Sequence, residues 1–347
     1  MNNYETLMRR CFELAKQGEG RVSPNPLVGC VVLDKDDNIV SEGYHHKYGE
    51  NHAERDALLK LHNGEEKGGT LVVNLEPCSH FGKTPPCTDL IIERGLSRVV
   101  FAMSDVNPKV KGVQKLKSAG IEVISGVLED DARKLNEVFI KNMTEQKSFV
   151  ALKTATTLDG KIAASNGSSK WITSQKARDE VKIIRNCYDA ILTSASTVIA
   201  DNPTMAHRKK ILLDRNLRCD FDAPFFKEGE IFVFCSGKSG VSDNITFIDT
   251  PVFNNRLDIE FVLEKAFQLG IKSVLVEAGG HLNGSFLAFA DKIYHFIAPK
   301  ITNDNTSLSA FDGFSITDIN ESKPFRFDSV NDFSPDLLLT YYPMDNK

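Results

Sequence analysis

"TLVVNLEPCSHFGKTPPCTDLIIERG", residues 70–95, contains three features that decide how the chain folds. Its opening segment, 70–76, is rich in β-branched and apolar side chains and predicts a buried strand. A loop with two cysteines, Cys78 and Cys87, follows, and the pattern over 88–95 predicts a short helix that ends at Gly95. A strand, a loop and a helix in this order are typical of an α/β domain.

Strands and helices alternate in the same way on both sides of this stretch. In the first half we expect strands over 27–34, 98–104 and 121–126, and helices over 52–63 and 129–143. A polar segment, TEQKS (144–148), then separates this half from a second one. Together with a length of 347 residues, it predicts two α/β domains, 1–146 and 147–347.

The second half also alternates strands and helices. We expect helices over 174–186, capped by Thr173 or Ser174, and over 258–270. The expected strands are 149–155, 189–194, 210–214, 230–236 and 273–280, followed by late antiparallel strands over 291–300 and 336–343. No G-x-G-x-x-G fingerprint is present, so a Rossmann dinucleotide site is not expected. The glycine pair in VEAGGHLNGS (276–285) suits phosphate binding, although such a pair is often only a tight turn.

Composition narrows the class of protein. The chain is 41% hydrophobic and 26% charged, with a net charge of −5, so a nucleic-acid partner is not expected. The first twenty residues lack the apolar core of a secretory signal, and no apolar run is long enough to span a membrane. Seven cysteines, an odd number in a long chain, argue against a disulfide framework and for a reducing, cytoplasmic setting.

Four residues form a candidate metal site. His52, Cys78 and Cys87 supply the imidazole and thiolates that zinc prefers, and three protein ligands leave a fourth position for water, as in catalytic zinc sites. Glu54, two residues after His52, is placed to move protons between water and a leaving amine. His52-Ala53-Glu54 followed by Pro77-Cys78 matches the pattern of zinc nucleobase deaminases.

Other interpretations stay open at this point. A structural zinc site would normally use four protein ligands, and no fourth one stands out, although His80 lies in the loop. A deaminase that acts on nucleic acid or a free nucleotide is a second alternative, against which the spacing of the two cysteines and the negative net charge argue. A zinc-stabilised interaction protein without activity is a third.

Longer motifs of the first half resemble a known family. PNPLVG (24–29), HAE (52–54) and PCSHFGKTPPC (77–87) resemble the deaminase domain of the bifunctional riboflavin-biosynthesis deaminase/reductase family. The resemblance implies a three-layer, cytidine-deaminase-like domain with His52, Cys78 and Cys87 as zinc ligands and Glu54 as the catalytic proton carrier. It also implies substrate contacts from Asn25, His45, Lys83, Asp105 and Asn107. Without the family, Asn25 or the segment 105–108 could be only a turn.

The second half resembles the reductase domain of the same family, through KTATTLDGKIA (153–163), SKWIT (169–173), TVIADNPTMAHR (197–208) and VEAGG (276–280). This implies a dihydrofolate-reductase-like fold that uses NADPH. The implied cofactor contacts are Ala155, Trp171, Thr197, Asp201, Ser236, Gly279, Gly280 and Ser285. The implied substrate contacts are Lys153, Ser169, Arg185, Met205, Arg208 and Glu277, with Asp159 shaping the same cleft. Arg185 and Arg208 would suit a sugar phosphate.

The resemblance implies a reaction sequence. We expect hydrolytic deamination of a ribosylated diaminopyrimidinone 5′-phosphate, followed by NADPH-dependent reduction of its ribosyl group to ribityl, on the path to riboflavin. The family also implies a homo-oligomer. Segments such as KKILLD (209–214) and APKITND (298–304) depart from the family pattern, so a deaminase with an inactive reductase-like second domain is the alternative.

Overall fold

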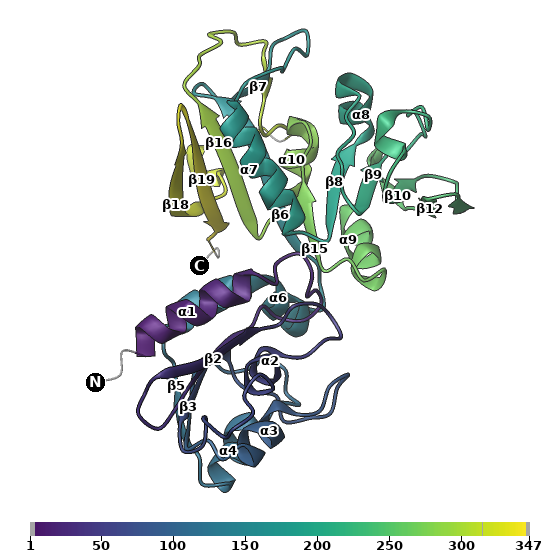
Figure 1. The fold of residues 1–347 in the computed structure, drawn as a ribbon. Coiled ribbons are helices and arrows are strands. Elements are labelled where there is room, and N and C mark those ends of the chain that lie inside the picture. The colour runs from purple at the N-terminus through teal and green to yellow at the C-terminus, as the bar shows by residue number, and fades with distance from the viewer. Residues whose placement is uncertain (1–3, 314, 345–347) are drawn as a thin grey trace. The chain divides into compact units, whose positions relative to one another are not determined.

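The computed structural model describes residues 4–313 and 315–344, and the chain separates into two compact units, Met1–Gln146 and Lys147–Lys347. Both units combine helices with a central β-sheet, as Figure 1 shows. The predicted α/β class is therefore confirmed. Each unit is described on its own below.

Unit 1 (Met1–Gln146) contains, within its described residues, a five-stranded sheet of order β2-β1-β3-β4-β5. The strands are β1 (Gly29–Leu33), β2 (Ile39–Tyr44), β3 (Thr70–Leu75), β4 (Arg98–Met103) and β5 (Glu122–Ser125). The helices are α1 (Tyr4–Lys16), α2 (Ala53–Leu58), α3 (Cys87–Glu93), α4 (Gly112–Ser118), α5 (Glu129–Leu135) and α6 (Glu137–Glu145). Strands β3, β4 and β5 are parallel, whereas β1 is antiparallel to β2 and β3.

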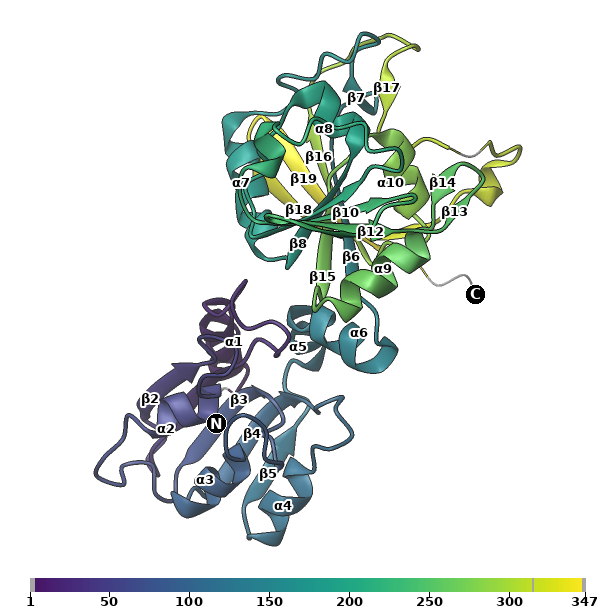
Figure 2. The same ribbon diagram turned by 90° about the vertical axis from the view of Figure 1, so that its right-hand side faces the viewer.

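Helices cover both faces of this sheet. A Cβ atom on Gly29 would lie 2.1 Å from the Cys11 carbonyl oxygen of α1, and one on Gly43 would lie 2.5 Å from the Ala57 nitrogen of α2. Gly43 pairs with Cys30, the neighbour of Gly29, so the two glycines point to opposite faces. The unit therefore has three layers, and Figure 2 shows α3 and α4 together along the sheet.

One predicted helix is two helices. The pattern over 129–143 predicted a single helix, but α5 and α6 are separated by Asn136, whose φ is −108°. The buried Asn136 side chain binds the backbone of Leu27 instead, accepting from its N–H at 2.8 Å and donating to its carbonyl at 3.1 Å. This contact from far along the chain gives a physical reason for the break and fixes the segment just after Asn25.

Unit 2 (Lys147–Lys347) contains a ten-stranded sheet of order β11-β12-β10-β9-β8-β15-β6-β16-β19-β18 in the part that the structure describes. Its strands are β6 (Phe149–Thr157), β8 (Ala190–Ser194), β9 (Lys209–Leu213), β10 (Glu230–Cys235), β11 (Gly240–Ser242), β12 (Ile245–Asp249), β15 (Ser273–Val276), β16 (Lys292–Ala298), β18 (Phe325–Phe333) and β19 (Asp336–Pro343). Short pairs are formed by β13 (Val252–Phe253) with β14 (Arg256–Leu257) and by β7 (Lys161–Ala163) with β17 (Leu308–Ser309). The helices are α7 (Gln175–Asn186), α8 (Ala195–Asp201), α9 (Ile259–Gln268) and α10 (Gly280–Phe286), with single turns η1 (Pro224–Phe226) and η2 (Ile319–Glu321).

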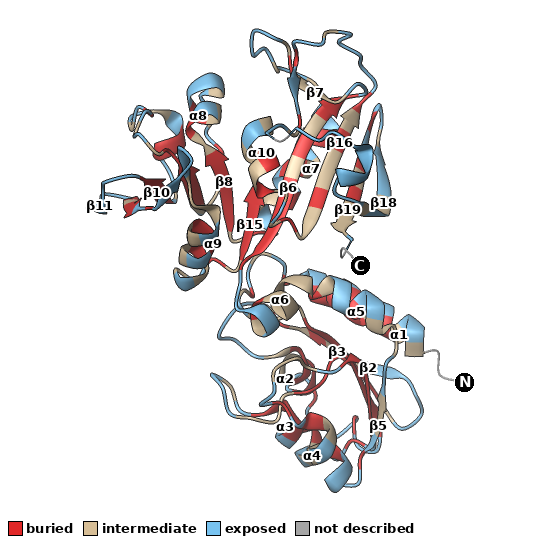
Figure 3. Cartoon of the chain, turned by 180° about the vertical axis from the view of Figure 1, so that it is seen from behind, coloured by how far each residue is buried: buried red, intermediate tan, exposed pale blue. Residues whose placement is uncertain are grey.

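In this sheet, the neighbouring strands β12, β10, β9, β8, β15, β6 and β16 all run parallel to one another, and their apolar residues form the core of the unit. The central strands β8, β15 and β6 are largely buried in Figure 3. The prediction of late antiparallel strands is half right: β16 is antiparallel to β19 but parallel to β6. Ser174 caps α7, as one of the two predicted alternatives had it, by accepting from the Ala177 N–H.

Across the described residues, every helix is too short or too polar to cross a membrane.

Candidate active sites

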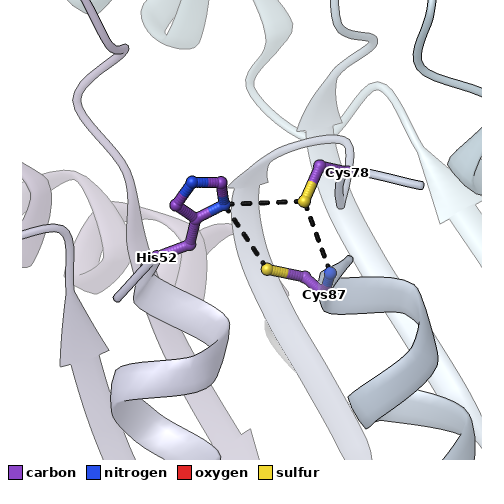
Figure 4. Close-up of side chains that lie close together, drawn as sticks. All are labelled: His52, Cys78 and Cys87. Carbon is purple, nitrogen blue, oxygen red and sulfur yellow. Dashed lines mark hydrogen bonds between the residues drawn. The ribbon is translucent and has the colours of Figure 1, made fainter. Parts of the chain in front are cut away.

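Three side chains meet at one point in unit 1. His52 lies directly before α2, Cys78 lies in the loop after β3, and Cys87 is the first residue of α3. The Cys78 and Cys87 sulfurs lie 3.5 Å and 3.6 Å from His52 Nδ1, and all three ligand atoms lie within 4.8 Å of one another (Figure 4). The sequence-predicted ligand set is therefore brought together.

The spacing of these atoms fits a zinc ion. Tetrahedral zinc, with Zn–S bonds of about 2.3 Å and a Zn–N bond of about 2.0 Å, separates a sulfur from a nitrogen ligand by about 3.5 Å. The two sulfur–nitrogen distances here are 3.5 Å and 3.6 Å. The backbone N–H of Cys87 also donates to Cys78 Sγ at 3.3 Å, which orients that sulfur. Three protein ligands in this arrangement leave one tetrahedral position for a small molecule.

The charges around the three ligands favour a thiolate and a proton-carrying carboxyl group. A hydrogen bond from Cys87, helped by His52, lowers the pKa of Cys78 to about 4. Glu54, in the first turn of α2, is buried, and this burial raises its pKa to about 7. A carboxyl group whose pKa is near neutrality can both accept and release a proton at physiological pH.

Asn25 and His45 form a pair beside the metal ligands. His45 is buried, which lowers its pKa, and its ring lies edge-on to His52 with centroids 5.5 Å apart. Its Nδ1 donates to the Asn51 carbonyl at 2.9 Å, so its Nε2 is the acceptor and receives the Asn25 amide at 3.1 Å. This arrangement fixes the rotamer of Asn25 and leaves its amide oxygen as an acceptor.

The other predicted deaminase-site residues lie on loops. Lys83 is exposed, and its Nζ lies 3.9 Å from the centre of the Tyr48 ring. Asp105 and Asn107 form consecutive turns, since Asp105 accepts from the Asn107 N–H and Asn107 accepts from the Lys109 N–H. Burial nevertheless raises the pKa of Asp105 to about 6. These turns are compatible with substrate binding, because in each side chain only Oδ1 takes part in the turn and the second polar atom is left for the substrate.

Two residues that sequence reasoning did not assign to the site hold it together. Glu76, two residues before Cys78, accepts from the Asp105 N–H at 3.4 Å and from the Val113 N–H at 3.0 Å. Asn74 is fully buried, accepts from the Gly29 N–H and donates to the Leu27 carbonyl, both at 2.8 Å. Asn74 lies on β3 and Glu76 directly follows that strand, and the polarity of these two buried residues next to a buried apolar run was the available signal.

Unit 2 has a cavity of about 1210 Å³ at the carboxyl ends of its parallel strands. Ligands of open α/β sheets bind at this edge, and the volume exceeds that of a usual single-ligand pocket, about 300–1,000 Å³. The space therefore fits a dinucleotide together with a second small molecule. Twelve of the sequence-predicted reductase residues line it: Lys153, Ala155, Ser169, Trp171, Arg185, Thr197, Asp201, Met205, Glu277, Gly279, Gly280 and Ser285.

A buried ion cluster forms one wall of this cavity. Glu277, directly after β15, accepts from Arg185 Nε at 2.6 Å and from Arg185 Nη2 at 3.0 Å, and lies 3.6 Å from Lys153 Nζ. Burial alone would raise the pKa of Glu277, but the two cations hold it below its usual range. Burial also lowers the pKa of Lys153. Two cations that share one carboxylate leave a net positive charge at this wall.

Two of the predicted ligand contacts, Arg208 and Ser236, do not line the cavity. Arg208 directly precedes β9 and is exposed, and the neighbouring His207 binds the Tyr188 carbonyl just before β8. Because β9 begins directly after Arg208, this residue lies at the amino ends of the parallel strands, whereas the cavity lies at their carboxyl ends. Ser236 follows β10 and donates its N–H to the Arg215 carbonyl at 3.0 Å, next to the cavity but outside its lining.

The glycine and tryptophan motifs have local structural roles as well. A Cβ on Gly280 would lie 2.2 Å from the Ser309 carbonyl oxygen, so this glycine permits close packing of α10, whereas Gly279 faces open space. Trp171 is 62% exposed and stacks with the guanidinium of Arg178 at 4.3 Å. Asp159 lies outside the lining and accepts from the Thr302 N–H at 3.1 Å, which ties two loops together.

Comparison with known proteins defines the class of each unit. Residues 1–103 match the family model "cytidine and deoxycytidylate deaminase zinc-binding region", and residues 148–339 match "RibD C-terminal domain". The metal-ligand cluster and the strand-end cavity thus belong to a zinc-dependent deaminase fused to a reductase.

Full-length relatives identify the family. The riboflavin biosynthesis protein RibD of Aquifex aeolicus is 40% identical over 96% of this chain and 97% of its own length. That of Actinobacillus pleuropneumoniae is 37% identical over 98% and 96%, respectively. The chain therefore belongs to the RibD family of bifunctional riboflavin-biosynthesis enzymes, as its motifs predicted.

Solved structures of related proteins show the same two-unit fold as this chain. A deaminase/reductase of Thermotoga maritima superimposes with a TM-score of 0.91 at 40% identity, covering 98% of this chain and 99% of that one. Acinetobacter baumannii RibD gives a TM-score of 0.89 at 34% identity, with 99% of each chain covered. The predicted fold class and the bifunctional assignment are confirmed.

Proposed function

We propose that unit 1 hydrolytically deaminates a ribosylated diaminopyrimidinone 5′-phosphate and that unit 2 reduces the ribosyl group of the product to ribityl with NADPH. The observation that carries the proposal is the His52, Cys78 and Cys87 cluster, whose spacing matches tetrahedral zinc with an open position. The Thermotoga structure is named a diaminohydroxyphosphoribosylaminopyrimidine deaminase/5-amino-6-(5-phosphoribosylamino)uracil reductase, which supports the same substrate class here.

Glu54 is the proton carrier of the deamination. Zinc bound to the three ligands would act as a Lewis acid that makes water a better nucleophile at neutral pH. Glu54 takes a proton from the attacking water and delivers it to the ring amine, so that a carbonyl forms and ammonia leaves. A buried carboxyl group with a pKa of about 7 suits both halves of this transfer.

Asn25 and His45 position the pyrimidine. The neutral His45 ring orients the Asn25 amide, whose oxygen then accepts from a ring N–H or amine of the substrate. Lys83, Asp105 and Asn107 complete the substrate contacts from the two loops described above. Lys83 is exposed and cationic, and therefore suits the phosphate of the substrate.

The ion cluster of unit 2 orients the substrate of the reduction. NADPH held in this cavity would supply a hydride for the anomeric carbon of the ribosyl group, and a proton from water would complete the gain of two hydrogens. Arg185 donates from both Nε and Nη2 to Glu277. Its role in this proposal is therefore to orient that carboxylate and not to bind the phosphate of the substrate. Lys153 Nζ adds positive charge at the wall for the oxygen atoms of the substrate. Ser169 and Met205 complete this part of the lining, while Ala155, Trp171, Thr197, Asp201, Gly279, Gly280 and Ser285 line the cofactor portion.

We further propose a cytoplasmic homo-oligomer. All seven cysteines lie in described residues and none forms a disulfide, which suits a reducing compartment. The edge strand β18 exposes Phe327 and Val330, each to 52%, and such an edge suits pairing with a second copy. A single monomer mass from light scattering would contradict the assembly.

A product assay tests the two reactions. Purified protein would receive the diaminopyrimidinone ribosylamino phosphate with and without NADPH, and products would be identified by mass. The proposal requires ammonia release in both samples and a gain of two hydrogens only with NADPH. Ammonia release with an intact ribosyl group in the presence of NADPH would instead indicate a deaminase with an inactive second unit.

A further inference from the structure

Lys210 is a charged residue in a core position of unit 2. It lies in β9, in register with Ile191 of β8 and Ile231 of β10, so the three side chains point to the same face of the sheet. Ile191 and Ile231 belong to a buried apolar cluster, and Lys210 itself is fully buried. An apolar side chain would fill this position without the cost of burying a charge, which indicates that the ammonium group has a specific use.

The Lys210 ammonium group is bound by partners that carry no net charge. Its Nζ donates to the backbone carbonyl of Phe225 and, at 3.4 Å, to that of Thr204, and it lies 4.7 Å from the centre of the Phe225 ring. Two carbonyl oxygens and one aromatic face match the three N–H donors of a lysine. The lysine therefore connects β9 to two other parts of the backbone, the single turn η1 and the segment 202–205.

The segment 202–205 follows α8 and forms part of the cavity lining. Within it, Met205 has a φ of 40°, a left-handed conformation that residues with a long side chain rarely adopt. Such a residue persists only where neighbouring contacts enforce its conformation. Met205 is buried, packs in the apolar cluster on the Lys210 face of the sheet and also lines the cavity, so its conformation shapes the cavity wall.

Lys210 supplies one of the contacts that enforce this conformation. The Thr204 carbonyl belongs to the same planar peptide group as the Met205 nitrogen, so a hydrogen bond to this oxygen restrains the plane that sets φ of Met205. Asn202, the other left-handed residue of the segment, ends α8, where asparagine is common and needs no such support. The support from Lys210 is therefore directed at the position of Met205.

We propose that Lys210 is a positioning residue for the reduction: its ammonium group holds the peptide group between Thr204 and Met205 and thereby places Met205 against the substrate. The inference rests on the reductase function proposed above, in which Met205 belongs to the substrate portion of the lining. Lys210 is fully buried, so it acts through Met205 and not by contact with a ligand.

The cofactor portion of the lining should be spared. Thr197 and Asp201 belong to α8, whose first turn is capped by Ser194. This helix is complete before the segment that Lys210 holds. Loss of the Lys210 hydrogen bonds should consequently weaken the binding of the substrate and leave that of NADPH unchanged.

The test is a kinetic comparison on the full-length protein. Lys210→Met has nearly the same length and no donor, and Lys209→Met is the matched control, because Lys209 is the neighbour in β9 and its Nζ lies 3.9 Å from Glu230 instead. NADPH oxidation with the deaminated pyrimidine as substrate gives KM and kcat, nucleotide fluorescence gives the Kd of NADPH, and ammonia release reports on unit 1.

Lys210→Met should raise the KM of the reduction roughly 10-fold, the effect of one hydrogen bond from a charged donor, with little change in kcat. The Kd of NADPH and the rate of ammonia release should stay at the values of the wild type and of Lys209→Met. Unchanged NADPH binding also shows that the cavity is folded.

An unchanged KM in Lys210→Met would overturn the proposal. Equal losses of affinity for the substrate and for NADPH would overturn it as well, because they would indicate a general structural role. If circular dichroism shows that Lys210→Met does not fold, Lys210→Gln decides instead: its shorter side chain keeps a polar group but cannot reach both carbonyls, so the KM should still rise selectively, by a smaller factor. A wild-type protein that oxidises no NADPH with this substrate would contradict the reductase function itself, a result distinct from any difference between the variants.

Discussion

Replacing Glu277 by glutamine should destabilise unit 2 strongly. In the native cluster the Glu277 carboxylate accepts two hydrogen bonds from Arg185 and lies 3.6 Å from Lys153 Nζ. The three side chains are only 7%, 24% and 16% exposed, respectively. Glutamine has nearly the same shape, but it has no negative charge, and its N–H₂ group faces the N–H donors of Arg185 and Lys153.

The size of the effect follows from this burial. Removing one partner of a buried ion pair costs about 3–5 kcal/mol of unfolding free energy, and the open cavity favours the lower end, about 3 kcal/mol. With a urea dependence of roughly 2 kcal/mol/M, the unfolding midpoint should fall by about 1.5 M. Replacing Arg185 by leucine in the same variant should recover part of the loss, because it removes one of the two unpaired charges.

The sole tryptophan provides the assay. Trp171 lies in unit 2 and stacks on Arg178, so its fluorescence during urea titration follows this unit alone. Lys182→Gln, which breaks an exposed pair with Asp179, is the matched control and should leave the midpoint unchanged. If Glu277→Gln showed the same midpoint as this control, the three charges would not be energetically coupled and the reasoning would be refuted.

Three further predictions concern single residues. Glu54→Gln should keep one zinc per chain by elemental analysis but lower the rate of ammonia release by roughly 10²–10⁴-fold, and a loss of zinc with activity would contradict its role as a proton carrier. Asn136→Ala should lower the unfolding free energy of unit 1 by about 1–3 kcal/mol and raise the KM of deamination, because the partly buried Leu27 N–H near Asn25 loses its acceptor. Circular dichroism measures the first effect and initial rates the second, and an unchanged KM would show that Asn136 does not position the substrate site. Burial lowers the pKa of His295 below its ordinary 6.5, so near and below pH 6.5 the unfolded chain binds a proton that the folded chain does not, and the stability of unit 2 should fall as the pH drops. In urea titrations between pH 7.5 and 5.5, His295→Gln should show a weaker dependence of stability on pH. Parallel stability curves for the variant and the wild type would disprove this assignment.

The metal site could be predicted from the sequence because its geometry is local. Cys78 follows a strand and Cys87 begins a helix, so a short loop brings the two sulfurs together, and His52 stands at the start of another helix on the same sheet. The ligand types then define the metal. Their convergence required only that the strand and the two helices form as their patterns indicate.

Features that depend on distant contacts could not be predicted in this way. The helical pattern over 129–143 is continuous, and only the backbone of Leu27 reveals why Asn136 interrupts it. The direction of β16 is set by its neighbour β6, because strand patterns are alike in parallel and antiparallel sheets.

Charged residues near the second site were the hardest to assign. Arg208 belongs to a motif, but the abrupt start of β9 places it at the wrong end of the strand for the cavity. Arg215 and Arg218 belong to no motif and resemble ordinary surface charges. Only the turn held by Asp214 shows that they border the cavity.

The central claim is that one zinc ion is held by His52, Cys78 and Cys87 with an open position for water. X-ray absorption at the zinc edge of the purified protein tests this directly. The account predicts two sulfur neighbours at about 2.3 Å and two nitrogen or oxygen neighbours at about 2.0 Å, one of which is exchangeable. Four protein ligands around the metal, or a folded protein that binds no zinc, would contradict it.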